Sequence, residues 1–150
     1  MNYWLMKSEP ESYSIEDLLR DKTTTWNSIR NYRARNIMRD EMKSGDLFLF
    51  YHSGDQKGVV GTGKILEPNL PDITALDKND DYYDPKASKE KNPWIAPKVA
   101  FVGKFKRLVT LGQIKANKRL KDMILLKIPR LSVQPVTKEE FEMIEKLGGE

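Results

Sequence analysis

The stretch Leu47-Phe48-Leu49-Phe50-Tyr51-His52 is a continuous apolar run that ends in the only histidine of the chain. A short run without polar alternation is typical of a strand buried on both faces of a sheet. A turn at residues 43–46 precedes it, and Gly45 there suits the left-handed conformation that ends many helices. A loop over residues 53–57 follows, and then a second strand over residues 58–66. The stretch therefore predicts the centre of a sheet.

Further strands and short helices are predicted on both sides of this centre. Residues 3–7, 99–105 and 130–136 have strand character, whereas residues 69–97 are rich in Asp, Asn and Pro and indicate loop with one helical turn near 72–76. Helix starts and a further helical turn are marked by Ser14, Asn31, Thr110, the capping box from Thr137 to Glu140, and residues 120–125. Strands outnumber helices and no βαβ unit recurs, so we expect one α+β domain over residues 1–150, built on a curved sheet or small barrel.

The composition is that of a globular domain of 150 residues, with 39% hydrophobic and 32% charged residues. No apolar run approaches the roughly 20 residues needed to span a bilayer, and the N-terminus lacks a signal-peptide pattern. There is no cysteine, which excludes disulfides, thiolate nucleophiles and cysteine metal sites. A single histidine excludes metal sites built from several histidines. We therefore expect an intracellular protein without a metal.

Charge is unevenly distributed, although the net charge is only +4. Residues 67–97 hold seven acidic residues and four lysines, whereas residues 98–130 hold ten basic residues and a single acidic one, Asp122. Such segregation is typical of a surface that binds phosphates. A solvated lysine face would produce the same pattern.

Residues 26–42 combine an aromatic side chain with a cationic helix. Residues 21–25 are predicted as a connector into Trp26, which lies among polar neighbours, and Asn31 is a suitable N-cap for the arginine-rich helix that follows. A planar, anionic ligand such as a nucleotide suits this combination, because a base gains about 1–3 kcal/mol by stacking on an aromatic ring. Alternatively, Trp26 only covers the core.

Three other motifs can be interpreted as structural features or as parts of a functional site. Residues 58–64 fit the start of a phosphate-binding loop, but Ile65 replaces the required Ser or Thr and Pro68 prevents a following helix, so glycines that bend a strand are the better interpretation. His52 is either a structural histidine or a polar contact to a ligand. Lys7 and Glu9 could form an acid–base pair or a surface ion pair.

Five blocks resemble one known family when taken together. They are Tyr3-Trp4-Leu5-Met6-Lys7-Ser8-Glu9-Pro10, residues 26–36, Leu49-Phe50-Tyr51-His52-Ser53, Tyr82-Tyr83-Asp84-Pro85-Lys86 and Arg130-Leu131-Ser132-Val133-Gln134-Pro135-Val136. In these blocks, which run in order along nearly the whole chain, the sequence resembles the EVE domain and in particular its prokaryotic members. The resemblance implies a PUA-like fold, a mixed sheet closed into a pseudo-barrel and flanked by short helices. This sequence departs from the family pattern at Arg33, where many relatives carry Gln, and at Ser28-Ile29, where Gly-Val is common.

The resemblance also implies a pocket for a modified base flipped out of DNA or RNA. By position, its ligand-binding residues would be Lys7, Ser8, Trp26, Asn27, Asn31, His52, Ser53, Arg130 and Ser132. We expect phosphate contacts from the arginines of the same region, Arg30, Arg35 and Arg39.

We therefore predict a binding module for a modified base in a nucleic acid, without catalytic residues, metal or cofactor. We assume a monomer in the cytoplasm, because no basic tail like that of the nuclear members precedes the domain. One alternative is a hydrolase of modified nucleosides that uses Lys7 and Glu9. The other is a protein-interaction module whose basic face is incidental.

Overall fold

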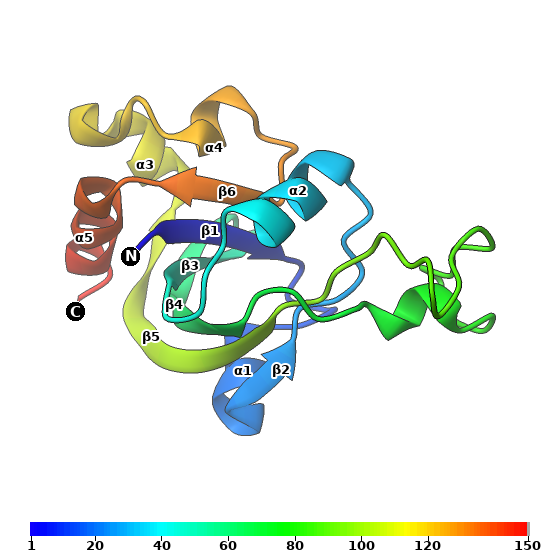
Figure 1. Cartoon of the computed structure of the whole chain (residues 1–150). Coiled ribbons are helices and arrows are strands. Elements are labelled where there is room, and N and C mark those ends of the chain that lie inside the picture. Colours follow the sequence, from blue (N-terminus) through cyan, green and yellow to red (C-terminus); the bar gives the residue numbers. More distant parts are fainter. Residues whose placement is uncertain (150) are drawn as a thin grey trace.

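A six-stranded mixed sheet organises the chain in the computed structural model, which describes residues 1–149 (Figure 1). The strand order is β2-β5-β4-β3-β1-β6, with β1 and β3 parallel and every other neighbouring pair antiparallel. The strands are β1 (Tyr3–Ser8), β2 (Thr23–Thr25), β3 (Leu47–His52), β4 (Gly58–Glu67), β5 (Lys98–Thr110) and β6 (Val133–Val136). The α+β class and the curved mixed sheet expected from the sequence are confirmed.

The parallel pair β1 and β3 forms the buried centre of the sheet. Along β3, Phe48 and Phe50 belong to one hydrophobic cluster, whereas Leu49 and Tyr51 belong to a second cluster on the other face. All four side chains are almost inaccessible to solvent. Successive side chains of a strand point to opposite faces, so an uninterrupted apolar run is what a strand covered on both sides requires.

Strand β4 curves because its pairing with β5 is irregular. The register shifts three times between these strands, and glycines occupy the close approaches. A Cβ atom at Gly63 would lie 2.3 Å from the Phe48 ring, so only glycine lets that ring pack over the strand. Residues 58–64 are therefore strand, and the phosphate-loop alternative is excluded. Strand β5 is longer than the predicted residues 99–105 and wraps around the sheet (Figure 1).

Short helices cover both faces of the sheet. They are α1 (Ile15–Asp21), α2 (Tyr32–Asp40), α3 (Leu111–Ala116), α4 (Ile124–Lys127) and α5 (Lys138–Leu147), with the 3₁₀ turns η1 (Ile73–Leu76) and η2 (Lys118–Leu120). Each N-cap predicted from the sequence makes its side-chain hydrogen bond to a first-turn amide, namely Ser14, Asn31, Thr110 and Thr137. Helices α1 and α2 contribute to the first cluster, and α3 and α5 to the second.

Three further predicted segments differ from the structure, besides β5. Residues 23–25 form β2 rather than a connector, because a strand of three threonines carries no apolar pattern and gains its identity only by pairing with β5. Strand β6 begins at Val133, three residues later than predicted. The turn predicted at 120–125 divides into η2 and α4.

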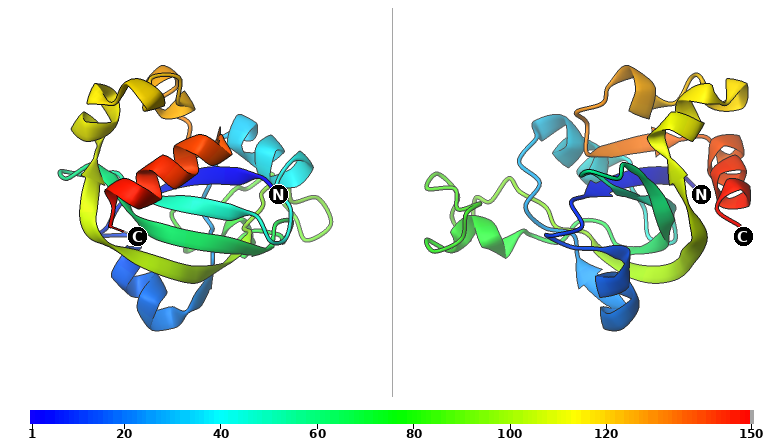
Figure 2. Two further views of the ribbon diagram at one scale, coloured as in Figure 1. Left: turned by 90° about the vertical axis from the view of Figure 1, so that its left-hand side faces the viewer. Right: turned by 180° about the vertical axis from the view of Figure 1, so that it is seen from behind.

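Residues 68–97, called the strap below, leave the sheet after β4 and return to it at β5. Figure 2 shows the strap projecting from the side of the molecule opposite to α5 and the termini. Trp94, Ile95, Ala96 and Ala75 anchor it through buried side chains. No helix in residues 1–149 is long and apolar enough to cross a membrane.

Candidate functional site

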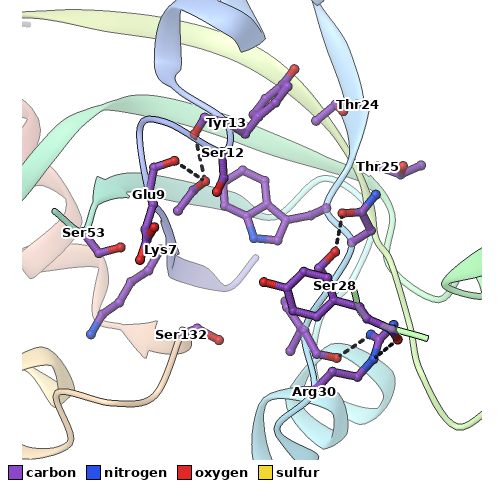
Figure 3. Close-up of a pocket in the computed structure, with 15 residues that line it drawn as sticks. Lys7, Glu9, Ser12, Tyr13, Thr24, Thr25, Ser28, Arg30, Ser53 and Ser132 are labelled. Atoms are coloured by element: carbon purple, nitrogen blue, oxygen red, sulfur yellow. Dashed lines mark hydrogen bonds between the residues drawn. The ribbon is translucent and has the colours of Figure 1, made fainter. Parts of the chain in front are cut away.

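A pocket of about 620 Å³ lies where β1 and β3 end and where β2 passes into α2 (Figure 3). Five parts of the chain converge on it, namely residues 7–13, residues 24–30, Ser53, Tyr82 of the strap, and Ser132 just before β6. We call it the main pocket. The residues that line it are Lys7, Ser8, Glu9, Ser12, Tyr13, Thr24, Thr25, Trp26, Asn27, Ser28, Ile29, Arg30, Ser53, Tyr82 and Ser132. Six of the nine ligand-binding residues predicted from the sequence are in this wall.

Main-chain hydrogen bonds position one side of the main pocket. The Lys7 amide donates to the Ser132 carbonyl at 2.9 Å, and the Ser53 amide donates to the Ser8 carbonyl at 3.0 Å. These bonds extend the β1–β6 and β1–β3 pairings beyond the regular strands. The Ser8 hydroxyl donates to the Tyr13 carbonyl at 2.8 Å and so holds the loop after β1. The side chains on this wall are therefore set by the sheet itself.

Trp26 is both core and pocket wall. Only 6% of the residue is exposed, and its ring meets Phe48 and Phe50 edge-on with centroids 5.6 and 5.0 Å away. The Trp26 amide donates to the Pro97 carbonyl at 2.7 Å, which continues the β2–β5 pairing by one residue. The two interpretations weighed for Trp26 are thus compatible, because a ring fixed by the core presents its remaining surface to the main pocket.

The turn between Trp26 and α2 has an unusual backbone at Ser28. Its φ angle is +72°, a left-handed conformation that side chains other than glycine adopt at a cost. The Ser28 amide donates to Asp72 Oδ2 at 2.7 Å, and its hydroxyl donates to Asn27 Oδ1 at 2.9 Å. The buried carboxylate therefore holds the strained turn from the strap side, and this fixes the pocket wall made by Asn27 and Ser28.

Arg30 joins the same turn to the strap. Its Nε and Nη2 donate to the Tyr82 carbonyl, and its Nη1 donates to the Ile29 carbonyl (Figure 3). Nη2 also donates to Thr74 Oγ1, and Nη1 also donates to Asp72 Oδ2 at 3.0 Å. A guanidinium has five N–H groups, and the protein accepts from all of them. A phosphate contact by Arg30 would therefore have to replace some of these bonds, and the predicted contact stays a prediction.

Asp72 is ionised at the centre of this network. It is fully buried, and burial by itself would raise the pKa of its carboxyl group. Hydrogen bonds from Thr74, Ser28 and Arg30 outweigh that effect and leave the pKa below its ordinary value. A buried carboxylate with several donors, one of them a guanidinium, is a stable charge.

The other two predicted phosphate contacts lie away from the main pocket on α2. Arg35 Nη1 donates to the Pro93 carbonyl at 3.0 Å and its guanidinium lies 5.0 Å from the Tyr32 ring. Arg39 forms an ion pair with Asp40 at 2.7 Å. Their contact with phosphate stays a prediction.

Three predicted ligand-binding residues are not in the pocket wall. His52 Nε2 accepts from the Ile15 amide at 3.1 Å, and burial lowers the pKa of its imidazole despite the opposing effect of Glu16 and Glu11. The histidine thus has a structural role as the acceptor for the first amide of α1, and its contact with a ligand stays a prediction.

Asn31 and Arg130 are the other two residues outside the wall. Asn31 Oδ1 accepts from the Ala34 amide at 2.9 Å, so its role is that of the helix N-cap. Arg130 is exposed in the turn before β6, and within residues 1–149 its side chain forms no hydrogen bond or ion pair. Neither residue lines the main pocket, so its geometry does not support a contact of Asn31 or Arg130 with a bound base.

Lys7 is a half-buried cation at the edge of the main pocket. Burial lowers the pKa of its amine, and the nearby positive charge of Lys57 lowers it further. The amine donates to the Pro129 carbonyl and lies 5.5 Å from the centre of the Tyr51 ring. Glu9 lines the same pocket, but the described residues include no ion pair between Lys7 and Glu9.

Sequence reasoning missed the hydroxyl-bearing and strap residues of the wall, which are Ser12, Tyr13, Thr24, Thr25, Ser28 and Tyr82. Single Ser and Thr residues in loops carry no periodic signal, and only folding brings the strap to the turn before α2. Of these residues, Tyr82 could have been predicted from the sequence, since it lies in one of the blocks shared with the family. Among residues 1–149, no group of three or more His, Cys, Asp or Glu side chains could hold a metal ion.

Comparisons with known proteins agree with this geometry. Thymocyte nuclear protein 1 of Rattus norvegicus is 47% identical over 167 residues, which cover 97% of this chain and 73% of that protein. A crystal structure of the human THYN1 protein in complex with 5-methylcytosine-containing DNA is 38% identical, with a TM-score of 0.92 over 100% of this chain and 99% of that one. A hypothetical protein from Leishmania major is 46% identical, with a TM-score of 0.95 over 99% of this chain and 94% of that one. The model of the EVE domain matches residues 2–147. The resemblance seen in five sequence blocks therefore extends over the sheet and the pocket alike, and the chain belongs to the EVE domain family, with its PUA-like fold.

Proposed function

We propose that this protein binds a modified base of a nucleic acid in the main pocket, with 5-methylcytosine in DNA as the first candidate. The observation that carries the proposal is the pocket itself, whose volume of about 620 Å³ lies in the range of small-molecule sites and whose wall combines aromatic and polar groups. The human relative solved with 5-methylcytosine-containing DNA supports the choice of ligand.

Two aromatic rings and several polar groups suit a flipped base. Trp26 is fixed by the core, whereas Tyr82 is 47% exposed and its carbonyl is held by Arg30. The hydroxyl groups of Ser53 and Ser132 have no hydrogen-bond partner among the described residues. Enzymes that act on flipped bases combine stacking with hydrogen bonds to the base edge in the same way.

Tyr82 offers the sharper test of the proposal, because Trp26 is too buried to be replaced without loss of stability. We expect Tyr82→Ala to weaken binding of a 5-methylcytosine oligonucleotide by about 5- to 150-fold, the equivalent of 1–3 kcal/mol of stacking. Fluorescence anisotropy with methylated and unmethylated oligonucleotides of one sequence measures this.

Tyr32→Ala is the matched control for Tyr82→Ala. Tyr32 is also exposed, at 56% against 47% for Tyr82, and also lies beside an arginine, but its ring packs at a tilt against Trp94 and does not line the main pocket. The control should bind both oligonucleotides like the wild type. If the wild type does not distinguish the two oligonucleotides, or if both variants lose affinity equally, the pocket is not the binding site.

The proposal includes no catalytic step. Its support is the state of the two residues that the hydrolase alternative requires: the Lys7 amine is held by the Pro129 carbonyl and forms no ion pair with Glu9. Incubation with a panel of modified nucleosides tests this, and conversion that disappears in Lys7→Ala would contradict it. A cytoplasmic monomer without a cofactor remains part of the proposal.

A further inference from the structure

Charge is distributed asymmetrically around the main pocket. On the strap side, Asp80 and Asp81 line a smaller hollow that shares Asn27, Ser28 and Tyr82 with the main pocket. An anionic strand that left the pocket in this direction would meet like charge. Coulomb repulsion therefore disfavours the strap side as a path for phosphates.

The opposite side of the main pocket carries the cation Lys7, with Glu9 as the one acidic residue of the pocket wall. Lys7 donates to the carbonyl of Pro129, the residue directly before the exposed Arg130 in the chain. In the view of Figure 3 its amine extends away from the middle of the pocket, on the side of Ser53 and Ser132. The turn that begins with Ser53 ends at Lys57, whose charge acts on the Lys7 amine. The positive charge of Lys57 is thus near enough to act on Lys7 at the edge of the pocket.

A second pocket of about 640 Å³ continues on this side. Lys57 and Lys115 line it, with Asp55 as its one acidic wall residue. The loop after β3 contributes Ser53 to the main pocket and Lys57 to this second pocket. Both lysines are exposed. In the part of the chain that the structure describes, the side chains of Lys57, Lys115 and Arg130 form no ion pair. An anion bound here would offset the repulsion between Lys7 and Lys57, and Lys57 and Lys115 would not have to give up an ion pair among the described residues.

We propose that the phosphate backbone flanking the bound base leaves the main pocket over Lys7 and Arg130 and continues along Lys57 and Lys115. This rests on the proposed function, because the main pocket defines where the strand starts. The arginine-rich face of α2, which the sequence favoured for phosphates, is not on this path. Contacts of this kind position a nucleic acid and do not read its sequence or modification.

The salt dependence of binding tests the path. The logarithm of the binding constant falls with the logarithm of the salt concentration by about 0.7 per phosphate contact on a single strand. The variant Lys57→Gln/Lys115→Gln should therefore reduce the magnitude of this slope by about 1.4 for a single-stranded oligonucleotide that carries one 5-methylcytosine. The variant should still bind this oligonucleotide more tightly than the unmethylated one. Fluorescence anisotropy over a series of NaCl concentrations gives both quantities.

Lys78→Gln/Lys89→Gln is the matched control, since it removes the same charge from two exposed lysines on the strap. Its slope should equal that of the wild type. An unchanged slope in Lys57→Gln/Lys115→Gln, or an equal decrease in both variants, would overturn the path while leaving the pocket proposal intact. Failure of the proposed function has a different signature, because the wild type itself would then show no preference for the methylated oligonucleotide.

Discussion

Asp72 links the strap to the pocket wall, and its replacement by asparagine removes that link without changing the size of the side chain. Its Oδ1 accepts from the Thr74 amide and hydroxyl at 2.9 and 2.6 Å, and its Oδ2 accepts from the Ser28 amide and Arg30 Nη1 at 2.7 and 3.0 Å. An asparagine has only one acceptor oxygen. If the asparagine oxygen keeps the bonds to Thr74, the amino group faces the N–H donors of Ser28 and Arg30. If the amide is flipped, the amino group faces the donors of Thr74 and the two bonds to Thr74 are lost.

The energetic cost follows from burial. Asp72 is inaccessible to solvent and the Arg30 side chain is only 21% exposed. Water therefore cannot solvate the Arg30 cation in place of the lost carboxylate. Removing one member of a buried ion pair costs about 3–5 kcal/mol. We therefore expect Asp72→Asn to lower the free energy of unfolding by about 3–5 kcal/mol, a large part of the 5–15 kcal/mol typical of a domain.

Urea denaturation followed by tryptophan fluorescence measures this loss, and hydrogen exchange of the Ser28 amide reports the local effect. The control is Asp40→Asn, which removes the exposed partner of Arg39 and should leave stability nearly unchanged. Because the pKa of Asp72 is lowered in the folded state, its stabilisation is complete above the unfolded value of about 3.9 and is lost as the pH falls through the folded value. The difference from Asp72→Asn should shrink in acid. A loss no larger than that of Asp40→Asn would refute the reasoning.

Two further predictions concern His52 and Trp26, whose structural contacts are described above. His52→Ala should lower stability by about 1 kcal/mol, because the Ile15 amide loses its acceptor, and should leave the preference for 5-methylcytosine unchanged. The lowered pKa of His52 means that the wild type loses stability as the pH falls below the ordinary value of 6.5, and that this loss is absent in the variant; equal pH profiles would contradict it. Trp26→Ala should cost about 3–5 kcal/mol in denaturation of the free protein, and Trp26→Phe clearly less; a stable Trp26→Ala would show that the ring is not part of the core.

Local patterns carried much of the fold. The apolar run at β3, the four N-caps and the turn at Gly45, whose φ angle is +93°, could be read directly because each depends on neighbours within a few residues. Strand β2 could not, since its threonines become a strand only through pairing with β5. The length of β5 likewise depends on the bulged pairing with β4.

The candidate site was only partly visible from the chain. The resemblance to the EVE domain placed Lys7, Ser8, Trp26, Asn27, Ser53 and Ser132 around one pocket, and the structure assembles these six residues. It could not show that the arginine nearest the pocket is consumed by the protein, because Arg30 and Asp72 lie 42 positions apart. Nor could it show that His52 caps a helix 37 positions earlier in the chain.

The sequence alone thus determined the class of fold, the helix boundaries set by caps, and the segregation of acidic and basic residues. Tertiary structure alone decided which cations are free to meet a phosphate, since a charge is available only if no distant partner already neutralises it. Arg30 is bound by Asp72 and by the Tyr82 carbonyl, whereas Lys57 and Lys115 have no such partner among the described residues. A guanidinium and an ammonium look alike as charges in a sequence, and only folding sets the contacts that distinguish them.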